Sequence, residues 1–154
     1  MSLDTALLIV HGLAAVGLLG ALTHQCAAVW VPKTDPRSFL ARFRAVQPAA
    51  FVNAVIVLYV FTFLLGSFLY PAYRIHVRIV LEDLRLKAPT GLFEIKEHVL
   101  ALGLCVLPAY WHSWRQQTAE HAVARRLHVS FLTLVVWYGY LVGHVLNNLR
   151  GFGS

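Results

Sequence analysis

The sequence has little charge, few sulfur-containing side chains and few acids. Only 13% of the 154 residues are charged, about half the usual share of a soluble domain. There are two cysteines, and the only methionine is Met1. Because soft Cu(I) sites favour methionine and cysteine ligands, copper transport fits the sequence poorly. The chain contains no GxSxG, Walker, CxxC or HExxH motif, so no nucleophile, phosphate or zinc-protease site is indicated.

Apolar residues dominate what is present. They make up 58% of the chain, and the mean hydropathy is +0.65. This composition excludes a soluble globular enzyme, a nucleic-acid-binding module and a disordered tail. The net charge is +6, from 13 Lys and Arg against 7 Asp and Glu. In so apolar a chain we expect these charges at the edges of a lipid bilayer, not on a nucleic-acid-binding face.

Four stretches are long enough to cross a membrane, which requires about 20 mainly apolar residues. The predicted spans cover residues 5–31, 47–72, 92–113 and 127–149. We find no repeat and no linker that would divide the chain. The sequence therefore predicts one all-α domain over residues 1–154, an integral membrane four-helix bundle with up-and-down connections.

The segment between the second and third spans has its own pattern. Isoleucines and arginines recur at helical spacing from Arg74 to Arg85, which predicts an extension of the second helix or a short interfacial helix. We expect the chain to turn at residues 88–91, with Thr90 as the cap of the third helix.

The loop charges predict an orientation in the membrane. Seven positive residues lie on one side, and six lie on the other with five acids. The richer side holds Lys33, Arg37, Arg42, Arg44, Arg115, Arg125 and Arg126. The positive-inside rule then places both termini on the periplasmic side of a bacterial inner membrane.

Six of the eight histidines lie in pairs on three of the spans, with separations of 13, 14 and 16 residues. At 1.5 Å per residue the two members of a pair are about 20 to 24 Å apart. Antiparallel helices would therefore arrange them in two layers. The outer layer is His11, His98 and His144, and the inner layer is His24, His112 and His128.

Two interpretations of these layers remain open. Polar groups at membrane depth are costly and face the protein interior or a cavity, so each histidine could simply bond to a neighbouring helix. Imidazole is also the commonest metal ligand, and two haems about 20 Å apart could pass electrons across a bilayer. At 100° per residue, His98 and His112 share one helix face, about 40° apart. The other two pairs are about 140° and 160° apart and would need a bend, a tilt or different partners.

The spacing His98-x13-His112 resembles that of the cytochrome b family, and the size of the chain resembles small four-helix bacterial b-type cytochromes. It is also similar to four-helix membrane proteins encoded with haem-copper oxidases. The resemblance implies one or two b haems bound between diagonal helices. It would pair His11 with His98 and His24 with His112, leaving His128 and His144 as substitutes or neighbouring groups.

Three further features have two or more interpretations. Arg74 and Arg78, near His76, could bind haem propionates or anchor the helix at the interface. Gly139 and Gly143 form a GxxxG pattern that suits a homodimer or packing within the chain.

The third feature is the cluster of Glu94, Glu97 and His98. Its acids could form salt bridges with Lys96, Arg74 or Arg78. Either acid could instead accept a proton during quinone chemistry, or Glu94 and His98 could bind a non-haem metal.

The expected function is electron transfer by a membrane-bound b-type haem protein, with quinone or a larger respiratory complex as candidate partner. One alternative is a non-redox accessory or assembly subunit of such a complex. Another is a metal-handling or ion-handling membrane protein. The sequence does not decide whether the protein is an enzyme.

Overall fold

A computed structural model describes residues 2–31, 38–39, 42, 46–116 and 118–151. Almost all of them are helical, and no strand occurs within these ranges. The all-α prediction is confirmed. The elements in chain order are α1 (Leu3–Trp30), the 3₁₀ turn η1 (Pro48–Phe51), α3 (Val52–Tyr73), the π-helical segment η2 (Arg74–Arg78), α4 (Ile79–Asp83), α5 (Lys87–Arg115) and α6 (Ala122–Gly151).

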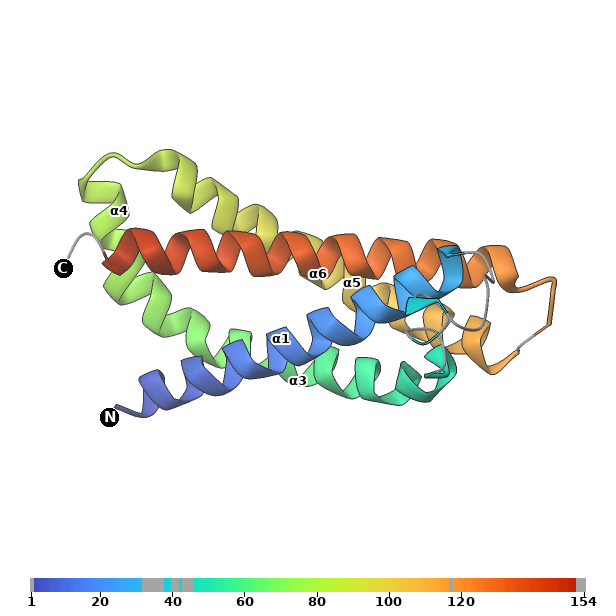
Figure 1. The fold of residues 1–154 in the computed structure, drawn as a ribbon. Coiled ribbons are helices and arrows are strands. Elements are labelled where there is room, and N and C mark those ends of the chain that lie inside the picture. Colours follow the sequence, from blue (N-terminus) through green and yellow to red (C-terminus); the bar gives the residue numbers. More distant parts are fainter. Residues whose placement is uncertain (1, 32–37, 40–41, 43–45, 117, 152–154) are drawn as a thin grey trace.

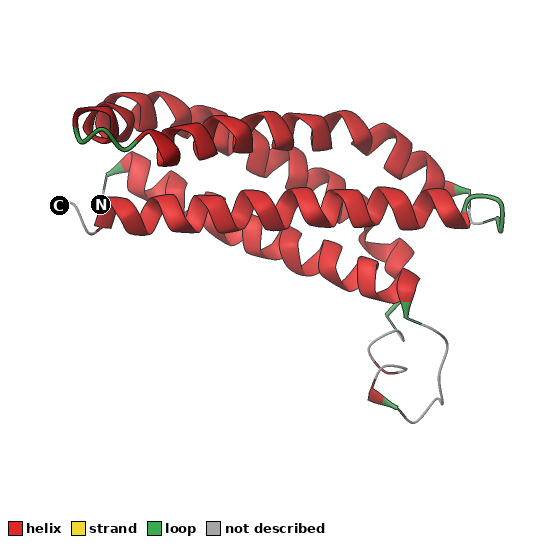
Figure 2. Ribbon diagram, turned by 90° about the horizontal axis from the view of Figure 1, so that it is seen from above, coloured by secondary structure: helices red, strands yellow, loops and turns green. Residues whose placement is uncertain are grey.

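The long helices lie side by side (Figures 1 and 2). α1 packs against α3 and α6, and α5 packs extensively against α6 and less extensively against α3. We call the end that holds the start of α1, the end of α6 and α4 the terminal end (Figure 1). The opposite end, with η1 and the turn between α5 and α6, is the loop end.

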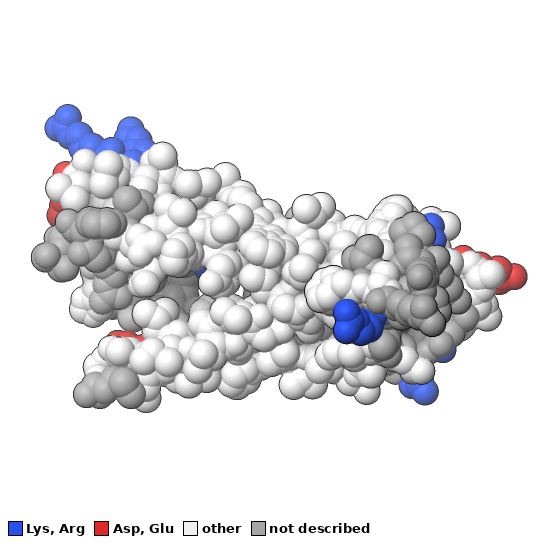
Figure 3. Space-filling view, in the orientation of Figure 1, with Lys and Arg blue, Asp and Glu red and all other residues white. Residues whose placement is uncertain are grey.

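Three helical stretches in the described chain are long and apolar enough to cross a membrane: Leu3–Trp30, Pro48–Asp83 and Ala122–Asn148. In Figure 3 the charged side chains gather at the two ends of the molecule, and the surface between them is almost uncharged. Both findings are consistent with a membrane protein. The predicted third span does form a helix of 29 residues, but Glu94, Lys96 and Glu97 make the first half of α5 less apolar than the other three helices.

The second span continues as a helix beyond the predicted membrane boundary, which confirms the predicted extension. Pro71 lies in the last turn of α3, where it has no N–H to donate to the preceding turn. The five π-helical residues of η2 follow the end of α3, and α4 then continues the helix to Asp83.

The predicted turn at residues 88–91 was wrong, because α5 already begins at Lys87. The chain turns at residues 84–86, where Arg85 has a positive φ of 57°. Pro89 lies in the first turn of α5, where a missing N–H costs nothing. Thr90 does not cap the helix; its hydroxyl donates to the Leu86 carbonyl one turn earlier, at 3.5 Å.

The densest packing lies between the middle of the molecule and the loop end. Leu22 of α1, Val55 of α3, Tyr110 of α5, and Val129 and Leu132 on one face of α6 are completely buried there. This packed region holds the helices together at one end and leaves the terminal end to contain the candidate site.

Candidate functional site: a cavity at the terminal end

The terminal end encloses a cavity of about 560 Å³ between α1, α3, η2, α5 and α6. Figure 3 shows the surface hollowed on this side, between α1 and the other helices. Ligand sites of proteins occupy about 300 to 1,000 Å³ and are mostly apolar, with a few polar groups that orient the ligand. The size and location make this cavity the first candidate for a binding site.

Three histidines line this cavity, and each comes from a different element. They are His11 of α1, His76 of η2 and His144 of α6. His11 and His144 belong to the predicted outer layer, whereas His76 was expected beside Arg74 and Arg78, outside both layers. The helical extension brings His76 to the cavity, because α3, η2 and α4 continue without a break past the end of the span.

The ring of His11 packs against Gly66 of α3. A Cβ atom added at Gly66 would lie 3.4 Å from Cε1 of His11, so the absence of a side chain there leaves room for the imidazole. The Nδ1 atom of His11 is buried and makes no hydrogen bond of ordinary geometry, although the imidazole lies close enough to the Thr62 backbone to interact with it. A buried polar atom without a good partner is costly.

Two other buried polar atoms at this cavity also lack partners. They are the hydroxyl oxygens of Thr62 and Tyr73, both on α3. Most buried polar atoms of native proteins are paired, so each exception requires an explanation. All three exceptions belong to residues that line this cavity.

A partly buried ion pair lies in the same lining. The Lys96 ammonium lies 2.9 Å from a carboxylate oxygen of Glu97, and the Lys96 side chain is only 13% exposed. The ammonium also lies over the Phe93 ring, 4.3 Å from its centroid. Arg78 joins Glu82 at 2.7 Å and Glu94 at 3.1 Å, so the predicted salt bridges of Glu94 and Glu97 are confirmed.

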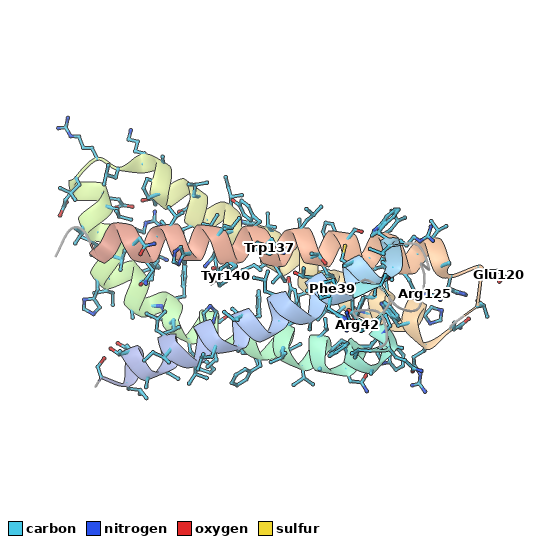
Figure 4. The ribbon with its side chains drawn as sticks, in the orientation of Figure 1. Phe39, Arg42, Glu120, Arg125, Trp137 and Tyr140 are labelled. Carbon is cyan, nitrogen blue, oxygen red and sulfur yellow. The ribbon has the colours of Figure 1, made fainter. Side chains whose placement is uncertain are left out.

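α6 supplies an aromatic and glycine-rich wall. The Tyr140 ring is nearly parallel to that of His144, at 6° and 6.3 Å between centroids, and Figure 4 shows Tyr140 in the region between α6 and α1. Gly139 and Gly143 also line the cavity. A Cβ at Gly139 would come within 3.0 Å of the Leu100 side chain of α5. The GxxxG face is therefore turned inward in this chain, toward α5 and the cavity.

His98 lies in a second and smaller pocket of about 230 Å³ between α3 and α5. Its Nδ1 atom lies 2.7 Å from the Glu94 carbonyl oxygen of its own helix. Tyr70, Phe93 and Glu97 line both pockets. We call this smaller pocket the His98 groove.

The inner-layer histidines are found in three different surroundings near the loop end. The His24 ring packs on Phe51 at 5.2 Å. The His112 ring meets His121 of the α5–α6 turn at 5.8 Å. His128 Nδ1 lies 3.2 Å from the Ser113 hydroxyl.

The predicted propionate arginines lie outside the cavity lining. Arg74 stacks over Tyr70 at 5.9 Å, and Arg78 is engaged by its two carboxylates. Within the described ranges, no three His, Cys, Asp or Glu side chains gather closely enough to hold a bare metal ion. A haem needs only one or two protein ligands, so this finding bears on ion sites and not on haem. Of the basic loop residues, Lys33, Arg37 and Arg44 lie outside the described residues.

Sequence reasoning did not identify Thr62, Tyr73, Lys96 or Tyr140 as site residues. Thr62 and Tyr73 are 11 residues apart on α3, three helical turns along one face. That spacing was a usable signal, but hydroxyls in an apolar helix are so common that it does not stand out. Lys96 was considered only as a salt-bridge partner, because the sequence does not show which side of α5 is enclosed.

No family model, curated protein or solved structure matches this chain.

Proposed function

We propose that the protein is a membrane-bound b-type haem protein that holds a haem in the terminal-end cavity and transfers electrons. The observation that carries this proposal is the meeting of His11, His76 and His144 in one cavity. In support, the His11 imidazole lies in the cavity lining against Gly66, which has no side chain to displace it.

The residues present suit a flat anionic cofactor. His11 and His144 would hold the haem, because they come from neighbouring helices and were predicted at one membrane depth. Gly139 and Gly143 keep the α6 wall thin enough for a flat ring to approach. Lys96 is the basic side chain of the lining; its ammonium is already paired with Glu97 and would use its remaining N–H groups toward a propionate.

When bound, a haem supplies one-electron chemistry at its iron. The protein's own part is to ligate and orient the cofactor and to keep water from it with the apolar walls of α1 and α3. We place the protein in a bacterial inner membrane, with both termini on the periplasmic side. The loop charges support that orientation. The proposed partner in electron transfer is quinone or a larger respiratory complex.

The test is to express the full chain, purify it in detergent and measure haem by the Soret band and the pyridine haemochrome. We expect one haem per chain, and we expect His11→Ala and His144→Ala each to remove most of it. His121→Ala, on the turn at the loop end, is the matched control and should keep full haem content.

Two further variants test the pairing implied by the family resemblance. His98→Ala and His112→Ala should retain the cavity haem, and loss of haem in both would instead favour the pairs that the resemblance implies, His11 with His98 and His24 with His112. A purified wild-type protein without a Soret band contradicts the proposal. If that protein co-purifies with a stoichiometric larger partner, the accessory-subunit function takes its place.

A further inference from the structure

Almost all of the net charge of the protein lies at the loop end. The loops of that end carry seven Lys and Arg against two acids, Asp35 and Glu120, whereas the terminal end carries six against five acids. The loop end therefore holds five of the six net positive charges. Such an excess attracts anions from outside the chain. Which side chains can bind an anion depends on what each is already bonded to.

The basic side chains of the two ends are paired differently. At the terminal end Arg78 and Lys96 both contact carboxylates. Among the described residues, no salt bridge forms at the loop end, and Figure 4 shows Glu120 at the tip of the α5–α6 turn. The arginines of the loop end are therefore available to an anion unless other atoms of the chain engage them.

Arg125 is engaged by its own chain. Its guanidinium donates to the carbonyl oxygens of Ser113, Gln116 and Thr118 at distances of 2.8 to 3.2 Å. The last carbonyls of a helix have no partner within the helix, so these bonds stabilise the end of α5 and the turn that follows it. Arg125 has few N–H groups left for a ligand.

Arg126 has a fixed aromatic platform instead. Its guanidinium lies over the Trp30 ring of α1, 5.4 Å from the centroid. The Trp30 indole donates to the Ser130 hydroxyl at 2.8 Å, one turn along α6 from Arg126, so the ring is held at the seam between α1 and α6. Stacking on a ring face leaves the N–H groups at the guanidinium edge free to donate. This edge matches a phosphate, which arginine often binds through two hydrogen bonds.

The surroundings of this stacked pair suit an amphiphile. Trp30, Val123 and Leu127 are 56%, 63% and 60% exposed, and the last two lie within one turn of Arg126 on α6. The pair also lies at the end of a candidate membrane span, because α1 ends at Trp30. Tryptophan is enriched at the level of the lipid headgroups. A ligand here meets a cation and exposed apolar side chains together.

We propose that the Arg126–Trp30 pair binds the phosphate of an anionic phospholipid of the phosphatidylglycerol class. The phosphate oxygens accept from the guanidinium edge, and the acyl chains extend along the exposed apolar side chains into the bilayer. The site lies at the opposite end of the molecule from the cavity, so it does not rest on the proposed haem function.

Two other partners fit this surface less well. A phosphatidylcholine headgroup has the same phosphate, but its ammonium meets the excess positive charge of the loop end. An acidic protein segment matches that charge, but it leaves the exposed Val123 and Leu127 without an apolar partner. The preference for an anionic lipid over a zwitterionic one is therefore the property to test.

The experiment measures lipid retention by the full chain in an uncharged detergent. Phosphatidylglycerol and phosphatidylcholine with the same acyl chains are added in equal amounts, and native mass spectrometry counts the lipids bound to each protein. We expect the first bound lipid to be phosphatidylglycerol, with a preference of about fivefold or more, which is the contribution of one basic side chain near an anionic headgroup.

Three variants and one control locate the binding. Arg126→Gln should remove the preference, and Trp30→Leu should weaken it by removing the platform. Arg126→Lys keeps the charge and loses the planar fork, so it should retain less than about half of the preference. Arg74→Gln is the matched control, because Arg74 also lies over an aromatic ring, that of Tyr70 at 5.9 Å, but at the terminal end. It should leave the preference unchanged.

Equal retention of the two lipids by the wild-type protein overturns the proposal, as does a preference that survives Arg126→Gln or that Arg74→Gln removes equally. Displacement of the bound lipid by inorganic phosphate at the same concentration would instead assign a site for free phosphate. Displacement by a glutamate-rich peptide, without discrimination between the lipids, would assign the surface to an acidic protein partner. Arg126 is exposed, so its variants should unfold at the same temperature as the wild type, which confirms that any lost preference is local.

Discussion

The two ends of the molecule treat buried polar groups in opposite ways. At the loop end the fully buried Gln25 accepts from the Tyr110 hydroxyl at 2.7 Å and donates to the Pro48 carbonyl at 2.8 Å. At the terminal end the buried polar atoms of His11, Thr62 and Tyr73 make no hydrogen bond of ordinary geometry. One region uses its polar groups to join helices, and the other leaves them available around a cavity.

Contacts between α1 and α6 show the same division. Near the loop end, Trp30 donates to the Ser130 hydroxyl at 2.8 Å and Trp137 donates to the Thr23 hydroxyl at 3.1 Å. The indole N–H of Trp114 is an unpaired exception in this region. Toward the terminal end the same two helices line the cavity. Close contacts between the helices at one end thus hold them in place around a cavity at the other end.

The largest predicted change in the free energy of unfolding comes from a single methyl group added where α3, α5 and α6 meet. A Cβ at Gly103 of α5 would clash with the Tyr59 hydroxyl and lie 3.0 Å from Val135 of α6. We expect Gly103→Ala to destabilise the protein by about 2 kcal/mol, because it displaces Tyr59 from its hydrogen bond to the Leu100 carbonyl. Unfolding in detergent by heat or SDS measures the change.

Gly20→Ala is the matched control for that variant, since nothing lies within 4 Å of a Cβ there. It should be neutral or should stabilise α1 by up to about 1 kcal/mol, because alanine is the better helix former. Equal destabilisation by the two substitutions would show that the helices do not meet closely at Gly103.

A smaller loss of stability is expected at the two buried hydrogen bonds of Gln25, near the loop end. Gln25→Leu removes one partner from Tyr110 and one from the Pro48 carbonyl, and should cost about 1 to 2 kcal/mol. Adding Tyr110→Phe should cost less in this background than in the wild type, because the two side chains share one hydrogen bond. Strict additivity in the double-mutant cycle would argue against that bond.

The smallest effect is expected at the cavity. Thr62→Val and Tyr73→Phe remove buried hydroxyls that have no partner, so the free energy of unfolding of the ligand-free protein should stay the same or rise by up to about 1 kcal/mol. The same variants should weaken retention of the cavity ligand, measured as haem content. A loss of stability comparable to that of Gln25→Leu would mean that these hydroxyls are already satisfied without a ligand.

Helix positions were predictable because they depend on local apolar content. The predicted span 5–31 became α1 (Leu3–Trp30), and span 127–149 lies within α6 (Ala122–Gly151). The error at residues 88–91 has a local cause too. Pro89 and Gly91 favour a turn by type, but a proline in the first helical turn is harmless, and Arg85 makes the turn instead.

The site was less predictable, because the position of a residue along its helix does not say which neighbouring helix or cavity its side chain faces. The similar spacing of the three histidine pairs, 13 to 16 residues, suggested three partners per layer. Yet His11 and His144 line the cavity, His98 faces a separate groove, and His76 joins the cavity from a helical extension. Face angles within one helix can be calculated from the sequence, but the rotation of each helix against its neighbours cannot.

The sequence by itself determined a helical, membrane-compatible chain and the depth of its imidazoles, because hydropathy and rise per residue are properties of local segments. Only the tertiary structure decided that the loop end is closed and the terminal end open. That difference depends on how side chains from distant segments fit together. Tyr59 fills the space above Gly103, whereas beside His11 the helices leave a cavity of about 560 Å³.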